Sequence, residues 1–196
     1  MTYTEFRAQA RVKLNGVWNK AAILWLIFGA LTGAIGSVPG AGGIVAILIA
    51  GPMMLALAQI FLKIDTGMDF QMDELFKGFN DFSRSLSAYL LIMLYTLLWS
   101  MLLIVPGIIA AIGYSQTFFI MAENPQMSAT EAMEASKKMM MDYKSYYFML
   151  MLSFLGWAFL CIFTFGIGYL WLQSYVEATR VLFYKRLISE PGTILT

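Results

Sequence analysis

Histidine is absent from this chain of 196 residues, and cysteine occurs once, as Cys161. Without histidine the chain lacks the commonest metal ligand and the side chain that titrates near neutral pH, so a zinc site and a histidine-based catalytic triad are excluded. One cysteine cannot form a disulfide within the chain. We therefore expect no catalytic residues, no metal site, no cofactor and no enzymatic activity.

Charge is also missing over long stretches of the chain. All charged side chains lie outside three uncharged runs, residues 21–62, 85–122 and 145–176. An apolar helix of about 20 residues crosses a bilayer, so each run is long enough for two crossings joined by a turn. Hydrophobic residues make up 60% of the chain and the mean hydropathy is +0.71, which exceeds the needs of one soluble core. The sequence predicts one all-α integral membrane domain, residues 1–196, surrounded by the lipid bilayer.

Glycine and proline interrupt each run and predict three outer turns, at residues 38–40, 106–107 and 166–168. The chain is therefore expected to form three αα-hairpins. The six predicted transmembrane helices are residues 18–37, 44–62, 85–105, 108–122, 145–165 and 169–187. At about 1.5 Å per residue, the fourth spans only about 22 Å, which is less than the roughly 30 Å hydrocarbon core.

The distribution of lysine and arginine predicts the topology. With the three turns facing outward, the outer loops carry no positive charge, whereas both termini and the two segments between hairpins carry all of it except Arg180. Positive residues mark the cytoplasmic side, so both termini are predicted to lie in the cytoplasm. A cleaved signal peptide ending near Gly36 is the alternative for the first segment, but a second span follows directly and would need the opposite charge bias.

A short amphipathic helix is predicted before each hairpin. Thr2 with Glu5 and Ser128 with Glu131 have the spacing of capping boxes, and apolar residues recur every three or four positions in each segment. These helices are expected to lie at the cytoplasmic membrane surface. The alternative is that they dock a partner protein or a second copy. The candidate docking residues are Phe76, Phe79, Lys137, Lys138 and Met140.

Three positions inside the even-numbered spans hint at an internal repeat. Gly51, Ser115 and Ser174 each lie eight residues after a turn glycine, and each is a break or polar point in an apolar helix. If the three hairpins are equivalent, these points lie at a similar depth, as expected around a shared cavity. Gly51 and Pro52 are predicted to break the second span, because proline removes a backbone hydrogen bond.

The last predicted span carries the strongest polar pattern, in which Gln173, Glu177, Arg180 and Tyr184 share one helical face. Ionised groups inside a membrane are expensive, so Glu177 and Arg180 should pair with each other or with another helix. They are either a gate or substrate contact, or a structural ion pair, or residues at the interface. The candidate intramembrane polar site comprises Gln173, Ser174, Glu177, Arg180, Tyr184, Ser115 and Gln116.

Several stretches resemble a known family in order and spacing: "LLWSMLLIVPGIIAAIGYSQTFFIMAENP", "EAMEASKKMM" and "FMLMLSFLGWAFLCIFTFGIGYLWLQSYVEATRVLFY". The chain is similar over nearly its whole length to the bacterial integral membrane family called domain of unknown function 975. The resemblance implies a multi-pass cytoplasmic-membrane protein without an assigned activity. A more distant similarity is to the membrane domain of some glycerophosphodiester phosphodiesterases, which implies lipid-related work.

Two functions from different classes fit these patterns. The first is a transporter- or channel-like protein for an ion, small solute or lipid, with the polar face of the last span lining the path. The second is a membrane-anchored accessory or scaffold protein whose cytoplasmic helices dock a partner. No nucleic-acid partner is expected.

Overall fold

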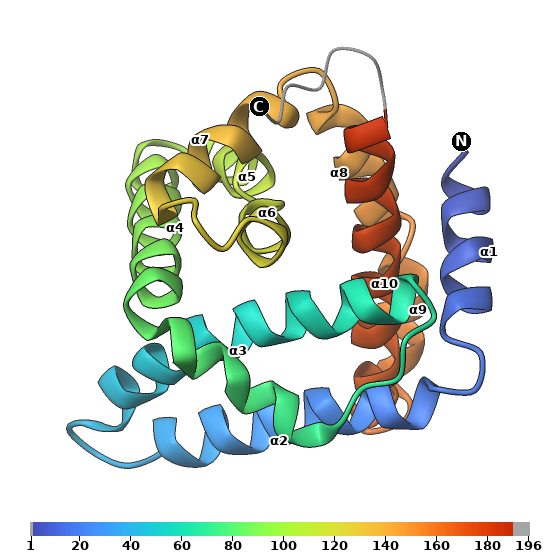
Figure 1. The fold of residues 1–196 in the computed structure, drawn as a ribbon, viewed down its shortest axis with the longest axis horizontal. Helices are drawn as coiled ribbons and strands as arrows, with labels where there is room; N and C mark the ends of the chain where they lie inside the picture. Colours follow the sequence, from blue (N-terminus) through green and yellow to red (C-terminus); the bar gives the residue numbers. More distant parts are fainter. Residues whose placement is uncertain (1, 190–196) are drawn as a thin grey trace.

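The computed structural model describes residues 2–189, and these form helices joined by short connections (Figure 1). The predicted all-α class is confirmed for these residues; residues 1 and 190–196 of the predicted domain lie outside them. The elements are α1 (Tyr3–Lys13), α2 (Trp18–Gly36), α3 (Gly42–Asp65), the 3₁₀ helix η1 (Met72–Asp81), α4 (Phe82–Leu102), α5 (Ile104–Gly113), α6 (Thr117–Glu123), α7 (Ala129–Met139), α8 (Lys144–Leu152), α9 (Leu155–Ile162) and α10 (Gly168–Ser189).

Within residues 2–189, five segments are long and apolar enough to cross a membrane: Trp18–Gly36, Gly42–Asp65, Met72–Leu102, Ile104–Glu123 and Lys144–Ile162. They overlap the first five predicted spans. The sixth predicted span, residues 169–187, falls within α10 but is not among the five, because its polar and charged residues lower its mean hydropathy. The chain has the helices of a multi-pass membrane protein.

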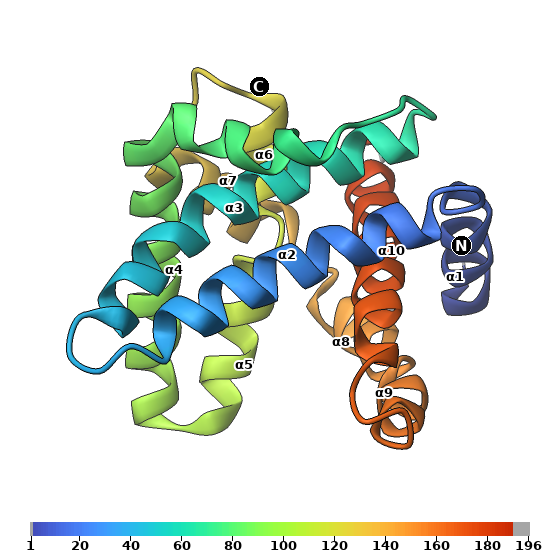
Figure 2. The same cartoon turned by 90° about the horizontal axis from the view of Figure 1, so that it is seen from below.

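The turns after α4 and α9 expose apolar side chains. In Figure 2 the turns after α4 and α9 lie at the bottom and the turn after α2 at the lower left, whereas η1, α6 and α7 lie in the upper half. Met101, Ile104 and Phe165 at two of these turns have exposed fractions of 77%, 76% and 98%. Soluble proteins rarely expose continuous apolar surface of this kind, and a bilayer would cover it.

Helix α3 runs unbroken through Gly51 and Pro52, so the predicted helix break is wrong. Close packing on both sides holds the helix together there. A Cβ atom on Gly78 of η1 would lie 1.9 Å from the Pro52 carbonyl oxygen, and one on Gly51 would lie 2.9 Å from the carbonyl oxygen of Ser85 in α4. Membrane helices tolerate an interior proline when neighbouring segments pack around it.

The turn of the second hairpin lies earlier than predicted. Leu103 is extended, with φ −161° and ψ 148°, and α5 begins at Ile104, which places Pro106 and Gly107 in its first turn. Proline is favoured there because its missing N–H would have no partner in any case. A Cβ atom on Gly107 would lie 2.9 Å from the Cα atom of Ser100, so glycine permits the close approach of α4 and α5.

Two of the predicted spans are broken helices. The fourth divides between α5 and α6, and the fifth divides between α8 and α9. A serine lies at each break: the hydroxyl of Ser115 donates to the Ile112 carbonyl at 2.7 Å, and that of Ser153 donates to the Leu150 carbonyl at 2.6 Å. Such local bonds compete with helical hydrogen bonds. Of the three points suggested by the repeat, only Ser115 coincides with a break, because Gly51 and Ser174 lie inside continuous helices.

The predicted capping boxes are present at the start of α1 and α7. The apolar stripe of α1 faces protein rather than lipid, however. Phe6 and Ala10 are buried, the Phe6 ring lies 5.9 Å from the Phe183 ring of α10, and the Tyr175 hydroxyl donates to the Arg7 carbonyl at 3.1 Å. Helix α1 is therefore an integral part of the packed core.

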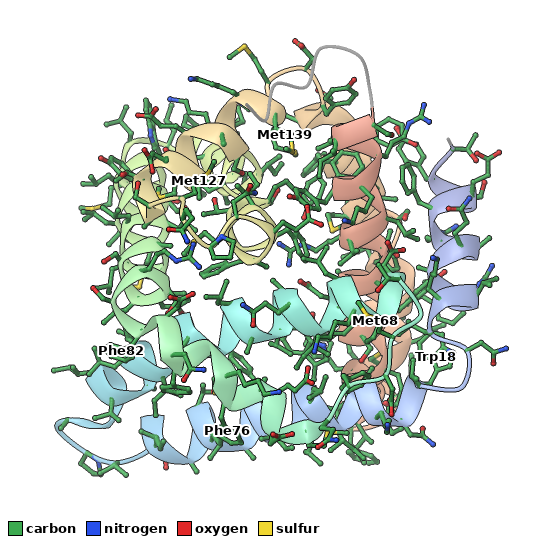
Figure 3. The ribbon with its side chains drawn as sticks, in the orientation of Figure 1. Trp18, Met68, Phe76, Phe82, Met127 and Met139 are labelled. Atoms are coloured by element: carbon green, nitrogen blue, oxygen red, sulfur yellow. The ribbon has the colours of Figure 1, made fainter. Side chains whose placement is uncertain are left out.

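The second predicted amphipathic segment is the 3₁₀ helix η1. In this geometry residues three apart eclipse one another, and the rings of Phe76, Phe79 and Phe82 accordingly stack at 6.5 and 6.4 Å. Phe76 and Phe82, labelled in Figure 3, are exposed. Met140 is fully buried against the core, so the prediction that it contacts a partner is wrong; Lys137 and Lys138 are exposed.

Candidate functional site

A cavity of about 540 Å³ lies between α3, α4, α5, α6 and α10, a size typical of small-molecule sites. Most of the side chains that line it are apolar or aromatic, and the charged ones come from α10. The lining residues are Met54, Tyr89, Ile92, Met93, Thr96, Leu97, Ser100, Ala111, Tyr114, Ser115, Phe118, Phe119, Glu177 and Arg180.

One wall of the cavity is a single face of α4. Its lining residues run from Tyr89 to Ser100 at spacings of three and four, which covers about 17 Å along the helix. Leu97 and Ser100, toward the outer turn, are exposed, whereas Phe119 and Glu177 are buried. The cavity therefore extends from the apolar outer surface into the interior of the protein.

The charged end of the cavity is an ion pair on α10. Nη1 of Arg180 donates to Oε2 of Glu177 at 2.7 Å, and Nη2 donates to the main-chain carbonyl of Ser115 at 2.7 Å. The guanidinium also lies 5.3 Å from the centre of the Phe119 ring. The exposed fraction is 8% for the Glu177 side chain and 25% for that of Arg180. A buried pair is tolerated when further hydrogen bonds support its members, and the bond from Arg180 to the Ser115 carbonyl is one such bond.

The break between α5 and α6 explains this arrangement. A broken helix leaves main-chain groups without intrahelical partners, and two other helices supply them. Arg180 binds the Ser115 carbonyl, while the Ser136 hydroxyl of α7 donates to the Gly113 carbonyl at 2.7 Å and accepts from the Gln116 amide at 3.2 Å. The break is thus a fixed part of the fold.

Three buried polar atoms in this region have no hydrogen-bond partner among the described residues: Nε of Arg180, Oγ1 of Thr96 and Oε1 of Gln116. Arg180 and Thr96 line the cavity. Buried polar groups are almost always hydrogen-bonded, so these atoms are polar groups whose hydrogen-bonding capacity the protein itself leaves unused.

The structure brings together three of the predicted polar residues, Ser115, Glu177 and Arg180. Gln116 and Ser174 are buried and do not line the cavity: Nε2 of Gln116 donates to Oγ of Ser115 at 3.0 Å, and the hydroxyl of Ser174 donates to the Leu170 carbonyl at 3.1 Å. Gln173, half-buried on the same helix, is likewise not a lining residue.

Tyr184 belongs to a second cluster, nearer the C-terminal end of α10. Its hydroxyl donates to Oε2 of Glu123 at 2.9 Å, and Lys185 forms an ion pair with the same carboxylate. A smaller cavity of about 330 Å³ lies beside this cluster, where Lys63 pairs with Glu74 at 2.7 Å. The Lys63–Glu74 pair joins α3 to η1, and the Lys185–Glu123 pair joins α10 to α6. The polar face predicted on the last span is therefore divided between two sites.

Sequence reasoning missed the contribution of α4. Tyr89, Thr96 and Ser100 lie on one face of that helix and, with Tyr114, supply hydroxyl groups to the cavity. Their spacing of seven and four residues places the three hydroxyl groups on one helical face, which the sequence already shows. The pattern is weak, because single hydroxyl groups are common in an uncharged apolar run. Within residues 2–189, no three histidine, cysteine, aspartate or glutamate side chains gather in a way that could hold a metal ion.

Comparison with known proteins places the chain in a family. No curated protein and no solved structure matches it. The similarity to the membrane domain of glycerophosphodiester phosphodiesterases receives no support. The model of the family described as "Protein of unknown function (DUF975)" matches residues 1–112 and 101–190. Because these matches cover most of the chain, as the sequence resemblance predicted, the protein belongs to the DUF975 family.

Proposed function

We propose that the protein crosses the bacterial cytoplasmic membrane six times as three hairpins, with both termini in the cytoplasm and α10 as the sixth span. Helix α10 has 22 residues, and at about 1.5 Å each these exceed the thickness of the hydrocarbon core. Its low hydropathy is compatible with a membrane span because Glu177 and Arg180 pair with each other and face protein or the cavity rather than lipid. A span surrounded by other helices needs no continuous apolar surface.

We further propose a transporter- or channel-like role, for an ion, small solute or lipid, rather than an enzymatic one. The observation that carries the proposal is that the Glu177–Arg180 pair lines a cavity at the break between α5 and α6. Transporters place their binding sites at interrupted helices, where main-chain groups and charges meet a cavity. An ion pair that served packing alone would not need to border an open volume.

The test is the double variant E177Q/R180Q in proteoliposomes. Glutamines can still hydrogen-bond to each other and to Ser115, and no unpaired charge is left, so the fold should survive. Conductance of monovalent ions and exchange of a fluorescent phospholipid between leaflets are measured. We expect at least one of these activities to fall tenfold or more.

The matched control is K20Q/D69N, which removes an exposed ion pair of the same length, 2.7 Å, outside the cavity. It should retain both activities. If E177Q/R180Q and K20Q/D69N behave alike while both fold, the transport proposal is wrong.

A partner-docking role is a second candidate, favoured by the exposed, stacked Phe76 and Phe82 rings. A photoreactive residue at Phe76 or Lys137 would capture one constant neighbour, either a protein or a second copy, if the bundle serves as an anchor. A transporter needs no constant neighbour, so captured lipid alone contradicts docking.

A further inference from the structure

We propose that the cavity binds a single-chain amphiphile that enters from the bilayer, with an apolar chain along α4 and a hydrogen-bonding head without net charge beside Glu177 and Arg180. The inference rests on the proposed function, because it names the class of molecule that occupies the same site.

The place where the cavity opens indicates the source of the ligand. Met93 and Leu97 line the cavity and are also 44% and 52% exposed, on the part of α4 that carries other exposed apolar residues. A molecule that reaches the cavity past these side chains comes from hydrocarbon rather than from water. A lipid-derived molecule meets this condition, and a hydrophilic solute does not.

The walls of the cavity fit an alkyl chain. The apolar part of the lining includes Ile92, Met54 and Phe118. The α4 wall alternates apolar side chains with the hydroxyl groups of Tyr89, Thr96 and Ser100, and its length of about 17 Å matches an extended chain of medium length. Methionine adapts its shape to irregular neighbours, so Met54 and Met93 allow the chain some freedom of position.

The inner end of the cavity indicates the head. Arg180 uses Nη1 and Nη2 within the protein but leaves Nε unpaired, and Oγ1 of Thr96 is also unpaired. Both atoms are buried, so a head group with hydrogen-bonding oxygen atoms would satisfy them after a side-chain movement that exposes them to the cavity. Glu177 already neutralises Arg180, so an anionic head would be repelled by Glu177 and a cationic head by Arg180. A zwitterionic or uncharged polar head avoids both repulsions.

The experiment measures binding to the purified full chain in nanodiscs, with lauroyl lysophosphatidylcholine as the probe. Two comparison probes are lauroyl lysophosphatidylglycerol, which has an anionic head, and glycerophosphocholine, which has no chain. We expect the first probe to bind at least tenfold more tightly than either of the others. Equal or tighter binding of the anionic probe, or of the chainless head, would overturn the proposal.

Two variants locate the site. A111W fills the cavity from α5, whereas L98W places the same indole side chain at an exposed position of α4 that does not line the cavity. We expect A111W to weaken binding tenfold or more and L98W to leave it unchanged; equal effects contradict the site. T96V, which removes one hydroxyl at nearly constant volume, should weaken binding roughly three- to tenfold and keeps the test sound if A111W does not fold.

The outcomes separate this inference from the proposed function. If E177Q/R180Q abolishes ion conductance while the wild-type protein binds no lysophosphatidylcholine, the amphiphile inference is wrong and the transport proposal stands. If the probe binds at the cavity while no flux depends on the ion pair, the transport proposal is wrong and the amphiphile site stands.

Discussion

The guanidinium of Arg180 donates a 2.7 Å hydrogen bond to the main-chain carbonyl of Ser115, which ties the last helix to the break between α5 and α6. The same guanidinium pairs with Glu177. The Ser115 carbonyl and the Glu177 carboxylate therefore both depend on Arg180 as a partner. Arg180 also lines the cavity, so it contributes both to stability and to the candidate site.

Replacing Arg180 by alanine should lower the free energy of unfolding by about 3–5 kcal/mol, because a largely buried carboxylate loses its partner. The double variant E177L/R180M removes both charges and should lose much less. Equilibrium unfolding of the purified proteins measures the difference. A double variant as unstable as R180A would show that the carboxylate is not the source of the loss.

Ser136 is expected to contribute to stability although it lies on a predicted surface helix. Its hydroxyl is buried and bonds to the Gly113 carbonyl and the Gln116 amide. S136A would leave both without this partner, at a cost of about 1–3 kcal/mol in the free energy of unfolding. S87A, at an exposed position of α4, is the control and should change little. Similar melting temperatures for the two variants would contradict this role.

The sequence was sufficient to predict the all-α class and five of the six expected spans as long apolar segments, because both follow from local composition. Uncharged runs and capping pairs such as Thr2 with Glu5 depend only on residues near each other in the chain. The pairing of Arg180 with Ser115 joins residues from different hairpins, so no local pattern contains it. The same holds for the α4 wall, which becomes a site only when α10 packs near it.

Glycine and proline were misread where tertiary packing decided their use. Pro106 was expected in a turn but begins a helix, and Pro52 was expected to break a helix that packing keeps whole. In both cases the residue is compatible with more than one local structure. Contacts with distant segments, such as that of Gly78 with Pro52, select among them.

G78A should be strongly destabilising. A Cβ atom there would lie 1.9 Å from the Pro52 carbonyl oxygen, which is backbone and cannot rotate away, so η1 must move from α3. We expect a loss of about 3 kcal/mol or more in the free energy of unfolding. G29A is the matched control, since nothing lies within 4 Å of its added methyl group. Equal unfolding curves for the two variants would refute the close contact of η1 with Pro52.

The capping box of α7 should make stability depend on pH in the acidic range. The hydroxyl of Ser128 hydrogen-bonds to the Glu131 carboxylate at 2.6 Å and the Ser128 amide does so at 2.8 Å, and these bonds lower the pKa of Glu131. The folded state therefore favours the ionised form. Its contribution to stability is present above the unfolded-state pKa and is lost as the pH falls through the folded-state pKa.

Below about pH 4.5, the wild-type protein should thus lose stability that E131Q does not lose, since glutamine caps the helix without titrating. Melting temperatures of both proteins between about pH 3 and pH 7 measure the effect. The matched variant is E134Q, at an exposed position of the same helix. Because Glu131, and not Glu134, belongs to the capping box, E131Q should flatten the pH profile of the melting temperature more than E134Q does. Equal flattening would show that the loss of stability at low pH comes from general charge repulsion instead.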